Sequence, residues 1–248
     1  MQRHLIDQQE IIHAIAEMGG FAESELAMAL SIITKSNDEL YGKIEGSDRA
    51  LDELDRKVND LCHVYVSKHG PMANDLRGIF AFVKISTHLE RIGDYAKNIA
   101  KRGNVVDHDR LLSAQAAVQR MGQTVLKSLS TMMNALALRD VALAKQVWRA
   151  DAAIDAHYDS VFAEIVQTIA VRPASVADGT HLLFIARNLE RIGDHISNIA
   201  ETLCFWIDGE RLDEEREFYE NTSEFTQTLE MPANMPFNDN APTTKKVS

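Results

Sequence analysis

Residues 88–100 read HLERIGDYAKNIA, and residues 188–200 read NLERIGDHISNIA. The two stretches lie 100 residues apart and share the segments LERIGD and NIA at matching positions. A match of this length inside one chain indicates that a structural unit has been duplicated. The sequence therefore predicts two copies of one unit.

Apolar residues on either side of the second stretch follow a helical period. Steps of three and four residues connect Leu182, Ile185, Leu189, Ile192, Ile196, Ile199 and Leu203, which is the pattern of an amphipathic helix with one apolar seam. Small residues lie at neighbouring heptad positions: Gly193 with Ala186 and Ala200, and in the first copy Gly93 with Ser86 and Ala100. A glycine inside a helix costs about 1 kcal/mol relative to alanine, so we expect another helix to pack closely there.

The same spacing predicts three long helices in each half of the chain. Proline is scarce outside the tail, and Asn37 or Asp38 is suited to cap the second helix. The Met18-Gly19-Gly20 segment predicts a kink or a close helix contact. The expected helices are about 4–37, 38–69, 73–102, 109–137, 141–170 and 176–206. Helices joined by short turns pack antiparallel, so the predicted fold is all-α, with six long helices forming two tandem three-helix bundles.

The duplication extends beyond the two quoted stretches. Met18-Gly19 returns as Met121-Gly122, and Asp48 and Asp52 return as Asp151 and Asp155, each 103 residues later. We therefore expect a first repeat at 4–103 and a second at 107–207. The remaining residues, 208–248, are rich in acidic side chains, proline and asparagine, which predicts a largely disordered tail.

Composition excludes several classes of function. The 248 residues include 37 acidic and 26 basic side chains, a formal net charge of −11, and nucleic-acid-binding domains are normally basic. Cys62 and Cys204 form no disulfide framework, which favours a reducing cytoplasm. The first residues resemble no signal peptide, and no apolar run has the roughly 18 residues of a spanning helix. We expect a cytoplasmic protein that meets a membrane only through a partner.

Each half carries two pairs of acidic residues spaced four apart, which places both carboxylates of a pair on one helix face. Such charges repel unless a proton, a basic side chain or a metal ion neutralises them. Arg91 and Lys97 are basic candidates in the first half. The heptad positions place the pairs outside the core, near the expected helix contact. The pairs are Asp48 with Asp52, Glu90 with Asp94, Asp151 with Asp155, and Glu190 with Asp194.

The simplest interpretation of one such pair is a solvated, ion-paired surface. Four pairs at matching positions of two repeats instead favour metal binding. Carboxylate oxygens suit hard cations such as Mg²⁺, Mn²⁺, Ca²⁺ or iron. Zinc is also a candidate, but carboxylates without nearby His or Cys suit it less well. Asn98 and Asn198 could each add a carbonyl ligand, although capping or a helix contact explains them equally well.

Other candidate motifs are weaker. Glu10 and His13 match one Glu-x-x-His element of di-iron bundles, but that site needs two such elements. His195 is replaced by Tyr95 in the first repeat, so we do not count it as a ligand. Arg91 and Arg191 could contact an anion such as phosphate, or simply pair with nearby acids.

Together, the doubled LERIGD, the Asp-x-x-x-Asp of each second helix, the early Met-Gly and the segment PMANDLR at 71–77 resemble the PhoU family. The resemblance covers about residues 4–206 and implies two three-helix bundles related by a pseudo-twofold axis. It also implies metal clusters held by the eight acids named above. It further implies a negative regulator that links a phosphate ABC transporter to a membrane sensor histidine kinase, commonly as a homodimer.

Two hypotheses follow for the function. The first is a non-catalytic cytoplasmic adaptor whose acidic clusters bind cations and whose long helices dock on the transporter and the kinase. The second is a metalloenzyme, such as a di-iron oxidase or a metal-dependent hydrolase, that uses the same carboxylates. The sequence offers this enzyme no second Glu-x-x-His element and no general base beside the acids.

Overall fold

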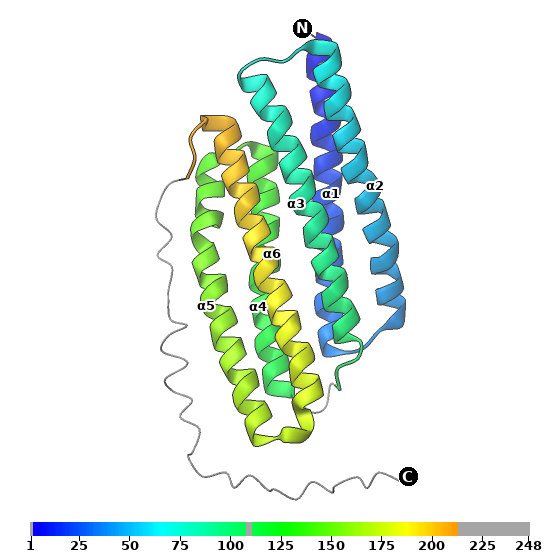
Figure 1. Cartoon of the computed structure of the whole chain (residues 1–248), viewed down its shortest axis with the longest axis vertical. Coiled ribbons are helices and arrows are strands. Elements are labelled where there is room, and N and C mark those ends of the chain that lie inside the picture. The colour runs from blue at the N-terminus through cyan, green and yellow to red at the C-terminus, as the bar shows by residue number, and fades with distance from the viewer. Residues whose placement is uncertain (1, 108–110, 213–248) are drawn as a thin grey trace, which may run out of the picture. The chain divides into compact units, whose positions relative to one another are not determined.

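The computed structural model describes residues 2–107 and 111–212, and within them six α-helices and no strand (Figure 1). The all-α prediction is confirmed, with helix ends within a few residues of those expected. The helices are α1 Gln2–Thr34, α2 Asp38–His69, α3 Asn74–Gly103, α4 Leu112–Leu138, α5 Val141–Val171 and α6 Val176–Asp208, with a short 3₁₀ helix η1, Pro173–Ser175, before α6.

Matching side chains start the second helix of each repeat. Asn37 accepts a hydrogen bond from the backbone N–H of Leu40 at 3.0 Å, and Asp140 accepts one from Leu143 at 3.0 Å. Both are N-caps, which satisfy backbone donors that a helix leaves unpaired in its first turn. At the other end of α2, Gly70 has a φ of +53°, a conformation that glycine adopts without steric cost.

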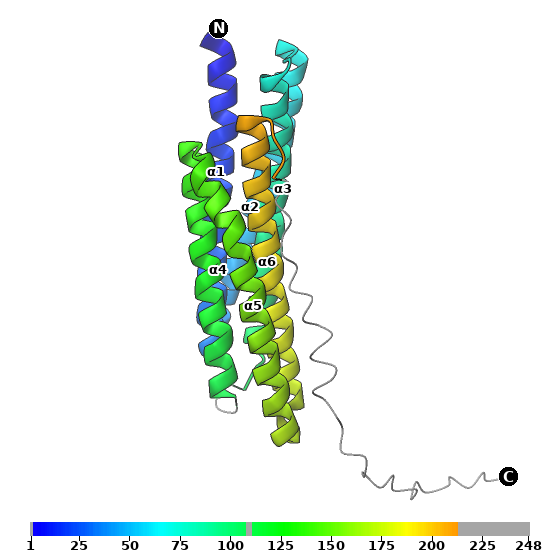
Figure 2. The same ribbon diagram turned by 90° about the vertical axis from the view of Figure 1, so that its left-hand side faces the viewer.

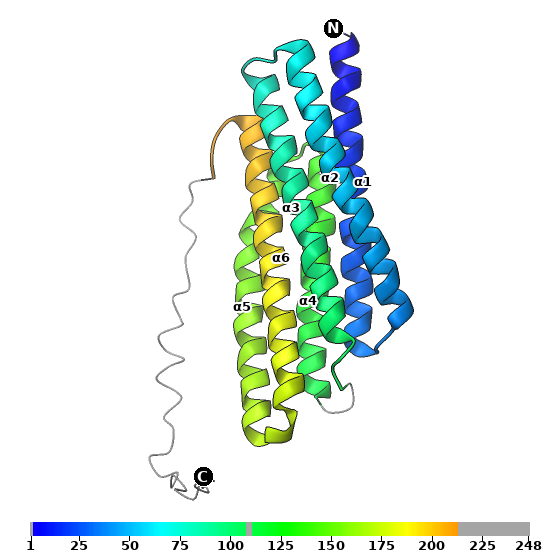
Figure 3. The ribbon, with the colours of Figure 1, turned by 45° about the vertical axis from the view of Figure 1, so that its right-hand side comes forward.

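The helices pack as two three-helix bundles, α1 with α2 and α3, and α4 with α5 and α6. Figures 1 and 3 show that successive helices run in opposite directions and that the turns alternate between the two ends. The apolar seams predicted for α3 and α6 are buried, including Leu89 and Ile92 in α3 and Leu189 and Ile192 in α6. The prediction of two tandem three-helix bundles is therefore confirmed.

The bundles contact each other through α3 with α6 and through α1 with α4 (Figure 2). A side chain at Gly19 would run into Met133, and one at Gly122 would run into Leu30. Gly122 and Met133 lie 103 residues after Gly19 and Leu30, so each repeat makes the same contact on the other. This reciprocity is the pattern of a pseudo-twofold axis. Helix α1 continues through Gly19 and Gly20, which makes the close-contact alternative correct.

The glycines of the two quoted stretches bring α2 and α5 close to α3 and α6. A Cβ at Gly93 would collide with Leu51 of α2, and one at Gly193 would lie 3.1 Å from Ile154 of α5. Leu51 and Ile154 occupy equivalent positions of the two repeats. The predicted close contact is therefore present in both bundles, and it sets the distance between the helices that carry the acidic pairs.

None of the helices described is both long and apolar enough to cross a membrane. Helix α6 ends at Asp208, with Gly209 at a φ of +78°. The predicted disordered tail lies almost wholly outside the described residues, which stop at 212. The proposed boundaries of the two repeats stay a prediction, since the described residues pack as one unit.

Candidate cation site: two carboxylate clusters

The four predicted acids of the first repeat lie together where α2 faces α3. Asp48 is 8% exposed, and Asp52, Glu90 and Asp94 are partly buried. Burial raises the pKa of Glu90, and the negative charges of Asp94 and Asp52 raise it further, while Arg91 lowers it. The charges of both acidic pairs therefore act on one another, and the structure joins them into a first cluster of Asp48, Asp52, Glu90 and Asp94.

The four equivalent acids of the second repeat lie together where α5 faces α6. Asp151 is 4% exposed, and one of its carboxylate oxygens, Oδ1, lies 3.2 Å from the position of a Cβ at Gly193. Burial raises the pKa of Glu190 to about 7, with Asp194 and Asp155 adding to the rise and Arg187 opposing it. These residues, Asp151, Asp155, Glu190 and Asp194, form the second cluster.

The expectation that all these acids lie outside the core is wrong for Asp48 and Asp151, which are buried. Asp155, by contrast, is exposed as predicted. The heptad assignment considered one apolar seam per helix, whereas α2, which carries Asp48, packs against both α1 and α3, and α5, which carries Asp151, packs against both α4 and α6. Positions outside the main seam are therefore covered by a second helix.

Glu25 on α1 joins the first cluster, and the sequence interpretation did not include it. Its side chain is fully buried, and Oε2 lies 2.9 Å from the position of a Cβ at Gly93. Neither carboxylate oxygen makes a hydrogen bond. The pKa of Glu25 is raised to about 7, chiefly by burial. The Ser47 side chain opposes this rise, the negative charge of Asp48 adds to it, and the positive charge of Lys97 opposes it. The sequence does contain a sign that Glu25 is buried. It shares one helical face with the apolar residues Met18, Ala22, Ala29 and Ile32, all of which are buried.

Basic side chains neutralise much of the first cluster. The ammonium nitrogen Nζ of Lys97 lies 2.6 Å from Asp48 Oδ2 and 3.4 Å from Asp94 Oδ1. Arg91 lies 3.4 Å from both Glu90 and Asp94. Burial alone would lower the pKa of Lys97, but the hydrogen bond to Asp48 and the charges of Asp48 and Asp94 outweigh it and raise that pKa. The basic partners named from the sequence therefore both contact these acids.

The second cluster is neutralised differently. Arg187 donates a hydrogen bond to Glu190 Oε1 at 2.7 Å, whereas Glu190 Oε2 is buried without a partner. Ser197, which is 1% exposed, stands where the first repeat has Lys97. A serine hydroxyl contributes a hydrogen bond but no charge, so this cluster has no ammonium group at the equivalent position.

Hard cations fit the chemistry of both clusters. All the donors are carboxylate oxygens, which Mg²⁺, Mn²⁺, Ca²⁺ and iron accept as ligands. The buried oxygens of Glu25 and Glu190 that make no hydrogen bond could gain a partner from a cation. Among the described residues, however, no three His, Cys, Asp or Glu side chains already surround one point as a metal centre. A cation would therefore have to draw these side chains together.

Of the weaker candidates, Arg91 contacts the first cluster and the charge of Arg191 lowers the pKa of Glu190 in the second, whereas the structure places Glu10, His13 and His195 apart from both. Glu10 and His13 are exposed on α1, which is not the inward geometry of a di-iron bundle. His195 contacts His88 across the α3–α6 interface, with 2.9 Å between their Nδ1 atoms. Arg191 lies over the ring of Tyr95 at the same interface.

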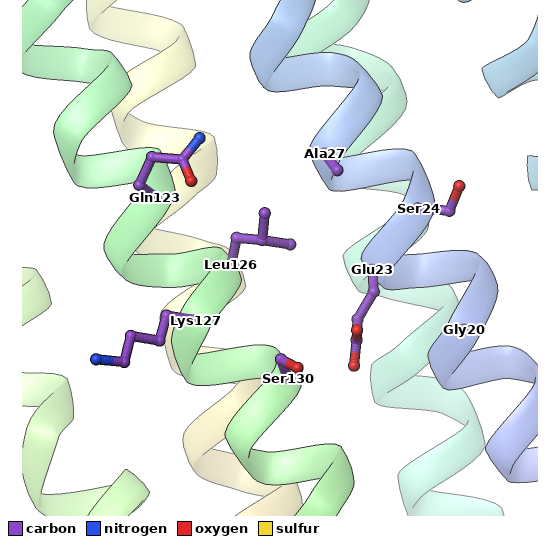
Figure 4. A pocket seen from close by; sticks show the side chains of 8 residues that line it. All are labelled: Gly20, Glu23, Ser24, Ala27, Gln123, Leu126, Lys127 and Ser130. Carbon is purple, nitrogen blue, oxygen red and sulfur yellow. The ribbon is translucent and has the colours of Figure 1, made fainter.

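Among the hollows of the described residues, two are lined by charged side chains of α1, α2 or α3. One, of about 350 Å³, lies beside the first cluster and is lined by Tyr41, Glu45, Asp48, Arg49, Lys97, Asn98 and Lys101. Asn98 is exposed there, and Asn198 is partly buried in the second repeat. The other hollow, of about 610 Å³, lies between α1 and α4. Figure 4 shows Lys127 pointing away from this second hollow, which leaves Glu23 as the charged side chain directed toward α4.

Comparison with known proteins matches both repeats. A family model described as the PhoU domain matches residues 15–103 and 118–203. A Caulobacter vibrioides (strain NA1000 / CB15N) protein named "Phosphate-specific transport system accessory protein PhoU homolog" is 37% identical over 212 residues, covering 84% of this chain and 92% of the relative. A protein of the same name from Xylella fastidiosa (strain 9a5c) is 35% identical over 214 residues, covering 86% and 90%.

Solved structures match the same fold. The crystal structure of PhoU from Pseudomonas aeruginosa has a TM-score of 0.80 and 26% identity, covering 83% of this chain and 99% of that one. The crystal structure of the phosphate transport system regulatory protein PhoU from Streptococcus pneumoniae has a TM-score of 0.79 and 25% identity, covering 85% and 100%.

Proposed function

This chain belongs to the PhoU family, and on that basis we propose that it is a non-catalytic accessory regulator of phosphate uptake. The observation that carries the proposal is the match of both repeats, in sequence and in fold, to proteins named as accessory to or regulatory of phosphate transport. The regulation is negative: when phosphate is sufficient, the protein represses the phosphate-starvation response.

The proposed partners are a phosphate ABC transporter and a membrane sensor histidine kinase. A protein that links two membrane partners from the cytoplasm needs exposed surface along its length, and two side-by-side bundles of long helices supply it. The net charge of −11 favours basic cytoplasmic surfaces as the docking targets. The working form is proposed to be a homodimer.

The regulatory proposal is tested by deleting the gene in the organism that encodes it. Expression of a phosphate-starvation reporter should then stay high in phosphate-rich medium, and the wild-type chain supplied from a plasmid should repress it. A reporter that responds normally to phosphate in the deletion strain would contradict the proposal. The empty plasmid is the control.

We also propose that the two carboxylate clusters bind divalent or iron cations. Asp48, Asp52, Glu90 and Asp94 would hold a cation in the first cluster, and Asp151, Asp155, Glu190 and Asp194 in the second. A bound cation would offset the repulsion between like charges and fasten α2 to α3 and α5 to α6. The support is the oxygen-rich donor set and the buried Glu190 oxygen that makes no hydrogen bond.

Metal content, measured by mass spectrometry on untagged protein purified without chelators, tests the cation proposal. The wild-type chain should carry bound Mg, Mn, Fe, Ca or Zn. The combined variant Glu90→Gln, Asp94→Asn, Glu190→Gln and Asp194→Asn should carry much less. Equal metal content in the two proteins would assign the metal to other sites and contradict the proposal.

A further inference from the structure

A fifth acid, Glu25 of α1, lies against the first cluster. Its Oε2 atom lies 2.9 Å from the position that a Cβ at Gly93 would take, one residue before Asp94. The charges of Asp48 and Asp52 both raise the pKa of Glu25, so its carboxylate is within electrostatic reach of the acids on α2. Glu25 therefore reaches the place where α2 meets α3 from the third helix of the bundle.

The second cluster has a carboxylate oxygen in the comparable place. Oδ1 of Asp151 lies 3.2 Å from the position of a Cβ at Gly193, the glycine equivalent to Gly93. Asp151 belongs to α5, whereas Glu25 belongs to α1. In both repeats a carboxylate oxygen thus lies against the glycine of the LERIGD segment, although a different helix supplies it.

In the first repeat, the acid equivalent to Asp151 is engaged by a base. The Nζ atom of Lys97 lies 2.6 Å from Oδ2 of Asp48. Both oxygens of Glu25, in contrast, are buried and make no hydrogen bond. A buried polar group without a partner is costly, and a bound cation would supply the partner that these oxygens lack.

A buried acid that binds no metal is the alternative. Its charge would be offset by Ser47 and Lys97, which both lower the pKa of Glu25, or it would be neutral. A neutral Glu25 would still bury an O–H group without an acceptor, and a charged one would bury two oxygens without a donor. Ligation of a cation removes this deficit, whereas protonation does not.

We propose that Glu25 is a fifth carboxylate ligand of the cation in the first cluster, so that this cation ties α1 to α2 and α3. The inference rests on the proposed function of the clusters as cation sites. The second repeat has Ser128 at the equivalent position, so the fifth carboxylate belongs to the first repeat. A cation in the first cluster therefore acts on α1, the helix that contacts α4 of the other bundle.

The test measures the first cluster in a parent chain whose second cluster is disabled by Glu190→Gln and Asp194→Asn. Mn²⁺ is titrated by calorimetry, at pH 8, into full-length protein that has been stripped with a chelator. Glu25→Met, which is similar in length and carries no oxygen, should weaken Mn²⁺ binding by at least about tenfold, because it removes a ligand. Circular dichroism of each variant confirms that it is folded before affinities are compared.

Tb³⁺ luminescence distinguishes a ligand from a nearby charge. Lifetimes measured in H₂O and in D₂O give the number of water molecules on the bound ion. Water replaces a lost ligand, so Glu25→Met should add about one water to the Tb³⁺ ion. A residue that acts through its charge alone would lower the affinity and leave the number of waters unchanged, and this result would overturn the inference.

Glu23→Met is the matched control, because it removes the same charge from α1 two residues away. Glu23 is partly buried and directed toward α4 (Figure 4). The variant should therefore keep the Mn²⁺ affinity and the number of waters of the parent chain. An equal loss of affinity in Glu23→Met and Glu25→Met would overturn the assignment to Glu25.

The remaining outcomes separate the inference from the cation proposal. An unchanged Mn²⁺ affinity in folded Glu25→Met would overturn the fifth ligand and leave the site of four acids intact. Absence of Mn²⁺ binding in the parent chain would remove the cation proposal for the first cluster, and the inference with it.

Discussion

Glu25 is a carboxylic acid placed among apolar side chains of α1, with both oxygens lacking a hydrogen bond. Burial raises its pKa from 4.5 to about 7. The folded chain therefore retains a proton there over a pH range in which the unfolded chain has lost it. Between those two values the free energy of unfolding falls as the pH rises, because the native state binds more protons than the unfolded state.

We predict that Glu25→Gln removes this pH dependence. Above pH 7, metal-free Glu25→Gln should be more stable than the wild type by roughly 1–3 kcal/mol. Well below pH 4.5 the two should be similar, because the acid is then neutral in both states. Urea unfolding at pH 5 and pH 8 in the presence of a chelator measures the difference.

Glu53→Gln is the matched control, since Glu53 is exposed on α2. It should leave the difference in unfolding free energy between pH 5 and pH 8 close to that of the wild type. The account of Glu25 would be wrong if Glu25→Gln also left that difference unchanged.

At the scale of the helices, Gly93 sets how closely α2 approaches α3. A Cβ at this position collides with Leu51, which is 1% exposed and has little room to move, and lies 2.9 Å from Glu25 Oε2. We predict that Gly93→Ala destabilises the chain by about 1–2 kcal/mol, since the cost of overpacking exceeds the gain in helix propensity.

Gly42→Ala provides the comparison, because a Cβ at Gly42 meets no atom within 4 Å. This variant should gain roughly 0.5–1 kcal/mol from helix propensity alone. Thermal or urea unfolding of the two variants should therefore give changes of opposite sign. Changes of the same sign would contradict the close-contact role of Gly93.

The N-cap of α2 gives a further prediction. Asn37→Ala removes the hydrogen bond to the Leu40 N–H and should lower the free energy of unfolding by about 1 kcal/mol. Asn37→Asp retains an accepting oxygen and should lose much less. Equal losses in the two variants, measured by urea unfolding, would show that the capping hydrogen bond is not the source of the effect.

The helices were predictable from sequence because each carries a local signal: an apolar period, a capping side chain such as Asn37, or a terminating Gly70. The close contact at Gly93 was predictable too, because a glycine inside a helix needs a packing reason. The burial of Asp48 and Asp151 could not be predicted, because it depends on how neighbouring helices pack over α2 and α5. Glu25 was missed because the search considered acidic residues spaced four apart on one helix, whereas Glu25 is a single acid that reaches the first cluster from α1.

At the scale of the molecule, duplication predicts two similar bundles but not how they meet. The bundles meet through α1 with α4 and through α3 with α6. In the sequence, the apolar residues that face the other bundle cannot be distinguished from those that face the core of their own bundle. The reciprocal contacts of Gly19 with Met133 and Gly122 with Leu30 supply that information. The same duplication makes differences informative. Lys97 contacts two acids of the first cluster where the second repeat has Ser197, and Arg187 contacts Glu190 where the first repeat has Thr87.

The central claim is that this chain acts as an accessory protein of a phosphate transporter. Binding of the purified chain to lipid nanodiscs that contain the phosphate ABC transporter of the same organism tests the claim most directly. Saturable binding to these discs, and none to empty discs of the same lipid, is the predicted result. Absence of binding to the transporter discs, or equal binding to both kinds of disc, would contradict the claim.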